Sequence, residues 1–300
     1  MWPMSRERPW SSPVGAVDAL RALTDLALPV GCAACGRPDH LLCPACEADV
    51  AASLWPSGPR AVRPRPVPRG LPPVHSAGRY AGSLAAVVTA YKDDGRRDCT
   101  GLLGGLLAGS LDAAVVGCPE VVARWRRGDG PVLVVPVPSS AAARRRRGDA
   151  PLRALAERAV TGFDPTEAVL ADALRARRRV ADQAGLGARE RAVNLEHAMA
   201  VRPRWGAVVD GAACVVVDDV LTTGSTLVEA ARALRAAGAT VVVAATICAT
   251  QRRSGGRTGS LSHGLERHPG PGFPVHEPPE HGIQVAHHGL RANAEPILVS

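Results

Sequence analysis

The chain has 300 residues, of which 46% are hydrophobic and 21% are charged, a balance that excludes a fully disordered protein. Aromatic residues contribute only 3%, so alanine, valine and leucine must form most of any core. The 36 basic and 28 acidic side chains give a net charge of +8, which favours anionic partners such as phosphorylated ligands or nucleic acid.

The apolar segments of the sequence do not indicate a membrane protein or a secreted one. No run of about 18 uncharged apolar residues is present, so the sequence predicts no membrane span. The apolar segment 17–30 is interrupted by Asp18, Arg21 and Asp25, unlike the core of a secretory signal. We therefore expect a cytoplasmic protein, in which the eight cysteines are thiols or metal ligands rather than disulfides.

The residue composition changes twice along the first third of the chain. Apolar residues at helical spacing predict a short amphipathic helix over 15–30, and a cysteine-containing segment follows at 32–46. Prolines crowd residues 55–75, where we expect a linker without helix or sheet. These features predict an N-terminal module over 1–54 and a linker over 55–75.

From residue 76 onward, candidate strands alternate with candidate helices. Helices are expected over 82–91, 100–116, 150–160, 188–199 and 225–237, and strands over 131–138, 167–174, 213–217 and 240–247. Most of these strands are continuous apolar runs, which is typical of strands buried on both faces. The alternation predicts an α/β domain over 76–250 whose mostly parallel sheet is flanked by helices.

The last segment, 251–300, is rich in glycine, proline, arginine and histidine and lacks apolar periodicity until its final residues. This composition predicts a disordered tail. A metal-binding role for its histidines is an alternative, although their spacing is irregular.

Four cysteines form two C-x-x-C pairs, Cys32–Cys35 and Cys43–Cys46, separated by seven residues. Each pair can place two thiolates on one ion, and a short turn between the pairs completes a tetrahedral site. Such a site suits zinc and, having no open position, is structural. The alternatives are four buried free cysteines or a redox-active pair.

The segment 215–227, VVVDDVLTTGSTL, carries the clearest functional pattern. A buried strand ends in Asp218 and Asp219, and a loop of small residues then opens a helix. Amides and the dipole at a helix N-terminus bind phosphate, and hydroxyl groups add donors. Carboxylates at a strand end can accept hydrogen bonds from a sugar diol, directly or through Mg²⁺. The pattern therefore predicts a ribose 5-phosphate site; the alternative is an ordinary strand–turn–helix with capping hydroxyls.

This segment resembles the motif by which type I phosphoribosyltransferases bind phosphoribosyl pyrophosphate (PRPP). More narrowly, the chain resembles the competence protein F (ComF) family over roughly residues 17–250. The resemblance rests on the four cysteines, Tyr80 with Lys92, Val135-Pro-Val-Pro138, Arg147-Gly148, and Gln183 with Arg191-Ala-Val-Asn194. It implies a type I phosphoribosyltransferase-like fold with a small N-terminal zinc module.

The resemblance also implies roles for individual residues. The PRPP site would comprise Asp218, Asp219, Thr222, Thr223, Gly224, Ser225 and Thr226. Ser139 and Ser140 would face the pyrophosphate, with Arg147 nearby, and Arg179 and Gln183 would belong to a loop that folds over PRPP. For the two arginine-rich segments, 144–147 and 177–189, a solvated basic surface is the alternative. Zinc and Mg²⁺ would be the metals, and no catalytic base is evident.

Three functions are compatible with these observations. An enzyme would transfer the phosphoribosyl group of Mg·PRPP to a nitrogen nucleophile and release pyrophosphate. Alternatively, the ComF resemblance implies a non-catalytic protein of DNA uptake, acting with a competence helicase on single-stranded DNA. A PRPP-binding regulator without chemistry is a third reading. The sequence indicates neither the acceptor nor the oligomeric state.

Overall fold

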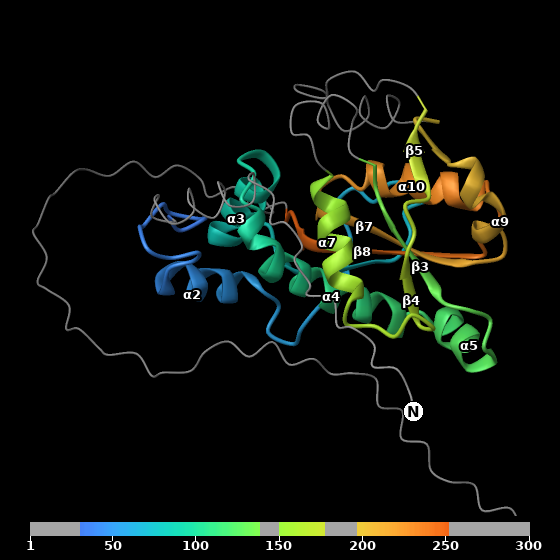
Figure 1. The fold of residues 1–300 in the computed structure, drawn as a ribbon, viewed down its shortest axis with the longest axis horizontal. Helices are drawn as coiled ribbons and strands as arrows, with labels where there is room; N and C mark the ends of the chain where they lie inside the picture. Colours follow the sequence, from blue (N-terminus) through green and yellow to red (C-terminus); the bar gives the residue numbers. More distant parts are fainter. Residues whose placement is uncertain (1–30, 139–149, 178–196, 252–300) are drawn as a thin grey trace, which may run out of the picture. The chain divides into compact units, whose positions relative to one another are not determined.

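The computed structural model describes residues 31–138, 150–177 and 197–251, and contacts divide them into two units (Figure 1). The first unit contains residues 31–53 and Ala81–Cys99; the second contains Leu54–Tyr80 and the described residues from Thr100 onward. The expected helix over 15–30, most of the one over 188–199 and nearly all of the expected tail lie outside the described residues.

The first unit joins the cysteine segment to a helical segment that follows much later in the chain. It contains α2 (Pro44–Ser53), α3 (Gly82–Asp93) and the short 3₁₀ helix η1 (Arg97–Cys99). Helix α3 buries Leu84, Val87, Val88 and Tyr91, which recur at helical spacing. The N-terminal module expected over 1–54 thus shares its unit with Ala81–Cys99, which the sequence places in the α/β domain.

The second unit contains a six-stranded sheet in the order β1-β2-β8-β7-β3-β4. Its strands are β1 (Arg60–Val62), β2 (Val74–Arg79), β3 (Val132–Pro136), β4 (Ala168–Leu170), β7 (Ala213–Leu221) and β8 (Val241–Ala249). Only β1 pairs antiparallel; every other pair in this sheet is parallel. A separate antiparallel pair consists of β5 (Leu174–Ala176) and β6 (Met199–Val201).

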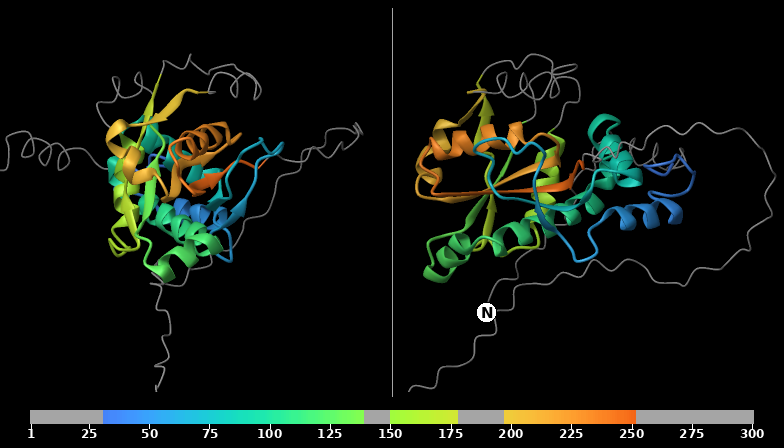
Figure 2. Two further views of the ribbon diagram at one scale, coloured as in Figure 1. Left: turned by 90° about the vertical axis from the view of Figure 1, so that its right-hand side faces the viewer. Right: turned by 180° about the vertical axis from the view of Figure 1, so that it is seen from behind.

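Helices cover both faces of the sheet, as the apolar strands require. Helices α4 (Thr100–Val116) and α7 (Pro151–Val160) lie on one face, and α10 (Ser225–Arg235) lies on the other (Figures 1 and 2). The other helices among the described residues of this unit are α5 (Pro119–Arg127), η2 (Pro203–Trp205) and α9 (Gly206–Val209). The chain therefore has the expected α/β class, with a mostly parallel sheet between helical layers.

Helix α4 is unusually apolar. The segment Arg97–Val116 is the only helical stretch within the described ranges that is long and apolar enough to cross a membrane by length and composition. Its composition has another explanation, because Leu103, Leu107 and Leu111 are fully buried and α4 packs against β2, β8 and α7. We interpret α4 as a core helix.

Several elements differ from the sequence prediction. The single strand expected over 167–174 is interrupted: β4 ends at Leu170, and β5 begins at Leu174 in the other sheet. Met199, expected at a helix end, begins β6. Helices α2 and α5 were not predicted. The segment 55–75, expected to lack helix and sheet, contains β1 and the first two residues of β2. Strand β1 tolerates nearby prolines because an edge strand needs hydrogen bonds on one side only.

Candidate functional site

The carboxylates of Asp218 and Asp219 lie near the carboxyl end of β7, a central strand of the sheet. The run from Ala213 to Val217 is fully buried, whereas both aspartates are half-buried. Val216 belongs to the core cluster that includes Leu227 of α10. Because side chains alternate along a strand, Asp218 lies on the α10 face of the sheet and Asp219 on the opposite face.

Backbone amides orient both carboxylates. The N–H of Asp219 donates to Oδ1 of Asp218 at 2.9 Å, and the N–H of Val220 donates to Oδ1 of Asp219 at 2.8 Å. These bonds hold two negative groups near the carboxyl end of β7, which continues through Val220 and Leu221 before the loop begins. Each carboxylate can accept hydrogen bonds from a diol or bind a divalent cation. Because the two side chains leave the strand on opposite faces, one ligand can reach both only at the carboxyl edge of the sheet.

The loop after β7 makes its turn at Gly224. This residue precedes α10 and has a φ of 80°, the left-handed region that favours glycine. A Cβ at this position would lie 2.8 Å from Cδ1 of Leu71 and 3.4 Å from Cγ of Pro68. Both the backbone conformation and the space therefore select glycine, so the loop enters the helix tightly.

Hydroxyl groups gather at the first turn of α10. Oγ1 of Thr223 lies 3.1 Å from Oγ of Ser225, and the N–H of Ser225 points to the same Oγ1 at 3.5 Å. Thr222 is exposed, whereas Thr223, Ser225 and Thr226 are half-buried. Thr222, Thr223 and Gly224 thus form the loop, and Ser225 and Thr226 begin the helix. Donors on a helix N-terminus suit a phosphate group.

A buried hydroxyl that sequence reasoning missed lies beside this pair. Thr246 of β8 is directly opposite Asp218 in the register, and Ser76 of β2 is opposite Thr246. Thr246 is fully buried, and its Oγ1 has no hydrogen-bond partner within the described ranges. The only sequence signal was a polar residue within an apolar strand, because strand register cannot be read from one segment.

An ion pair between the buried Glu229 and the half-buried Arg232 fixes α10 to β6. Oε1 of Glu229 accepts a hydrogen bond from the N–H of Met199 at 2.8 Å, and Arg232 donates to the Met199 carbonyl at 3.0 Å. The two side chains also form a 2.7 Å ion pair. Burial alone would raise the pKa of Glu229, but hydrogen bonds from Arg232 and Met199 outweigh it and lower that pKa. Sequence analysis did not single out either residue.

The four cysteines Cys32, Cys35, Cys43 and Cys46 come together in the first unit. Their Sγ atoms all lie within 4.8 Å of one another, and those of Cys35 and Cys43 are 3.7 Å apart. A zinc ion bonded to four sulfurs at about 2.3 Å separates them by about 3.8 Å, so the arrangement fits a tetrahedral S₄ site. Cys35 is exposed and the other three are buried.

The surroundings shift the pKa values of two of these thiols in opposite directions. Burial opposes ionisation of Cys32, yet hydrogen bonds from the amides of Cys43, Cys35 and Ala34 lower its pKa to about 6. Ser83 stabilises the Cys46 thiolate, but burial and the other three sulfurs raise the pKa of Cys46 to about 12. Four neighbouring thiolates repel one another, and a bound divalent cation compensates this repulsion.

The structure does not describe the remaining predicted site residues. Ser139, Ser140, Arg147, Arg179 and Gln183 lie outside the described residues. Their expected roles at pyrophosphate and in a covering loop remain predictions. The described part of the site thus consists of the carboxylates, the loop at Gly224 and the first turn of α10.

Comparison with protein families agrees with this geometry. Residues 146–260 match the family model described as a phosphoribosyl transferase domain. The matched range includes β7, the Gly224 loop, α10 and β8. The match supports the type I phosphoribosyltransferase superfamily that the sequence motif predicts.

Proposed function

We propose that this chain binds PRPP or a related ribose 5-phosphate at the end of β7 and is a ComF-like protein. The observation that carries the proposal is the combination of paired carboxylates, Asp218 and Asp219, with a tight glycine loop opening α10. The family match over the same elements supports it.

The phosphate of the ligand would bind at the first turn of α10. The N-terminal amides of this helix, its dipole and the converging hydroxyls of Thr223 and Ser225 supply donors around one anion. Gly224 permits the left-handed turn that leads into this helix, while its Cα packs against Leu71 and Pro68. The loop thus binds the part of the ligand that does not react.

The ribose diol would face the carboxylates of Asp218 and Asp219. Ionised carboxylates accept hydrogen bonds from both hydroxyl groups, and Mg²⁺ bound with PRPP would neutralise charge on the pyrophosphate. Fixing phosphate and diol together orients C1 of the ribose. Orientation of a reacting carbon in this way lowers the entropic part of a transfer barrier.

The reaction that this arrangement supports is phosphoribosyl transfer. The bond between C1 and the pyrophosphate oxygen breaks with its electron pair leaving on pyrophosphate, and a nitrogen nucleophile bonds to C1. The aspartates stabilise positive charge that develops on the sugar ring. The protein would therefore act mainly by positioning and electrostatics.

Pyrophosphate release tests this activity directly. Intact protein would be mixed with Mg·PRPP and a panel of purine and pyrimidine bases, with Asp219→Asn as the matched variant. We expect release with at least one base, strongly reduced in the variant. Tight PRPP binding without turnover for any base would contradict the enzyme hypothesis and favour a PRPP sensor. Absence of PRPP binding would reject PRPP as the ligand.

We also propose that the cysteine quartet holds structural zinc. The sulfur separations support this, and the four thiolates leave no position for substrate. Bound zinc would cross-link the two C-x-x-C turns. Metal analysis of purified protein should give about one zinc per chain by the four-ligand rule.

A second candidate function, binding of single-stranded DNA during uptake, has one specific observation in its favour. Residues 50–92 contain no Asp or Glu, and the arginines between β1 and β2 and at their ends, Arg60, Arg63, Arg65, Arg69 and Arg79, are exposed. A basic segment without acidic residues attracts phosphate backbones. Replacing Arg60, Arg63 and Arg69 by alanine should weaken oligonucleotide binding and flatten its salt dependence; unchanged binding would reject this candidate.

A further inference from the structure

The cysteine turns are held at two places by a segment that lies far away in the sequence. Residues Ala81–Cys99 belong to the same unit as the cysteines, although the sequence offers no motif that links them. One contact is made at the start of α3 and the other after its end. Both fall on residues next to cysteine ligands or on the ligands themselves.

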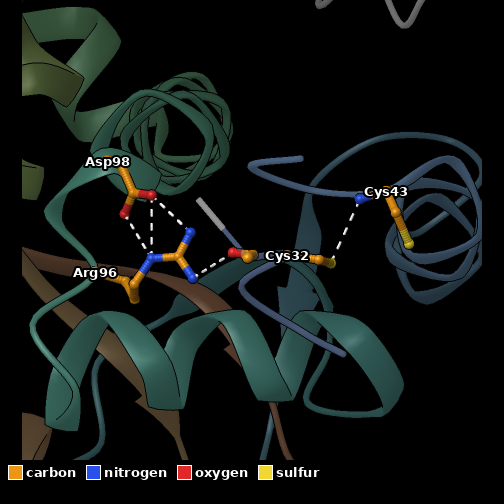
Figure 3. A network of polar contacts seen from close by, with 5 residues as sticks. Cys32, Cys43, Arg96 and Asp98 are labelled. Atoms are coloured by element: carbon orange, nitrogen blue, oxygen red, sulfur yellow. Dashed lines mark hydrogen bonds and ion pairs between the residues drawn. The ribbon is translucent and has the colours of Figure 1, made fainter. Parts of the chain in front are cut away.

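Arg96 makes the first contact. Its Nη1 donates to the carbonyl oxygen of Gly31 at 2.8 Å, and its Nε and Nη2 donate to Asp98 at 3.1 and 2.6 Å (Figure 3). Asp98 thus holds the guanidinium plane in place. Figure 3 shows the planar group between Asp98 and the backbone that leads to Cys32.

The bond to Gly31 fixes the peptide that precedes Cys32. The carbonyl of this peptide accepts from Arg96, and its N–H, which belongs to Cys32, donates to the Arg37 carbonyl at 2.7 Å. Both polar groups of one peptide are therefore bound, so its plane cannot turn. Sγ of Cys32 in turn accepts from the N–H of Cys43 at 3.4 Å, which joins the two C-x-x-C turns.

Ser83 makes the second contact. Its N–H donates to Oδ2 of Asp49 at 2.6 Å, and its side chain lies within hydrogen-bonding reach of both Asp49 and Cys46. Asp49 and Cys46 both belong to α2. The first turn of α3 therefore holds the second C-x-x-C pair, as Arg96 holds the first.

We propose that Arg96, held by Asp98, is a positioning residue of the metal centre, and that Ser83 supports the same centre from the other end of α3. The proposal rests on the proposed zinc occupancy. Partners outside the ligand shell orient ligands, and their loss typically costs about 10- to 100-fold in metal affinity. The module that binds zinc is then the cysteine segment together with Ala81–Cys99, rather than the cysteine segment alone.

Zinc affinity tests the proposal. The full chain would be titrated with Zn²⁺ against a chromophoric chelator, comparing wild type with Arg96→Met and Asp98→Asn. Arg97→Met is the matched control, because Arg97 bonds the Tyr91 carbonyl and lies over the Tyr91 ring at 4.6 Å. We expect a dissociation constant about 10- to 100-fold higher for Arg96→Met and a smaller increase for Asp98→Asn.

A second readout separates positioning from general loss of folding. With Co²⁺ as the probe, the visible bands of tetrahedral thiolate coordination should weaken or shift in Arg96→Met, while Arg97→Met matches wild type. Equal zinc affinity and equal Co²⁺ spectra for the two arginine variants would overturn the proposal. If Arg96→Met does not fold, Asp98→Asn decides by the same criteria. Wild type that binds no zinc would reject the zinc occupancy itself.

Discussion

Substitution of Gly224 by alanine tests whether the loop before α10 depends on a left-handed residue and a close approach. Gly224 has a φ of 80°, and an added Cβ would lie 2.8 Å from Cδ1 of Leu71. The second contact, 3.4 Å to Pro68, involves a ring that cannot move away by rotation. Alanine therefore meets both conformational strain and crowding.

The two contributions can be estimated separately. A left-handed conformation costs a non-glycine residue about 1–2 kcal/mol. Crowding of a packed site costs typically about 1–3 kcal/mol, and we take the lower end because the nearest atom is the movable end of the Leu71 side chain. The expected loss of unfolding free energy is then about 2–3 kcal/mol, the sum of these two contributions.

Gly128 provides the matched control. It ends α5 with a φ of 72°, and a Cβ there would have no neighbour within 4 Å. Urea unfolding should therefore show a loss of only about 1–2 kcal/mol for Gly128→Ala. Calorimetry should show weaker ribose 5-phosphate binding for Gly224→Ala alone. Equal stability losses and unchanged binding in both variants would refute the reasoning.

Three further predictions concern the buried pair, the phosphate donors and the cysteines. Glu229→Gln should cost about 2–4 kcal/mol near neutral pH, far more than Glu157→Gln in the exposed pair with Arg153. Folding lowers the pKa of Glu229, so the loss of unfolding free energy in Glu229→Gln should be complete above the ordinary glutamate pKa and should disappear as the pH falls through the lowered pKa. Urea melts in which this loss does not depend on pH would contradict the prediction. Ser225→Ala should weaken ribose 5-phosphate binding in calorimetry, whereas Ser53→Ala at the end of α2 should not. Cys43→Ser should lower the zinc content and increase proteolysis of the cysteine segment, and full zinc content would count against the quartet.

The strand, loop and helix that carry the candidate site were predictable because their signals are local. The strand, both aspartates, the glycine and the hydroxyls lie within residues 215–227, so one stretch of sequence displays the strand-to-helix change. The spacing of the cysteines likewise indicates a tetrahedral cluster without knowledge of the fold. Apolar runs around β3, β7 and β8 also predict a mostly parallel sheet, as the structure has it.

Residues that act through distant contacts were not predictable. Thr246 lies beside Asp218 only because β8 pairs with β7 in one register. Arg96 reaches Gly31 across 65 residues of sequence, and Glu229 reaches Met199 across 30. No local pattern records such pairings, since they follow from how the elements pack. For the same reason the grouping of α3 with the cysteines differed from the expected domain boundary.

Calorimetric titration of the intact protein with Mg·PRPP tests the central claim most directly, using Thr223→Val as the paired variant. The account predicts one binding site per chain, weakened about 10- to 100-fold in the variant, because a hydrogen bond to a charged phosphate contributes about 1.5–3 kcal/mol. Absence of binding to the wild type, or equal affinity of wild type and Thr223→Val, would contradict it.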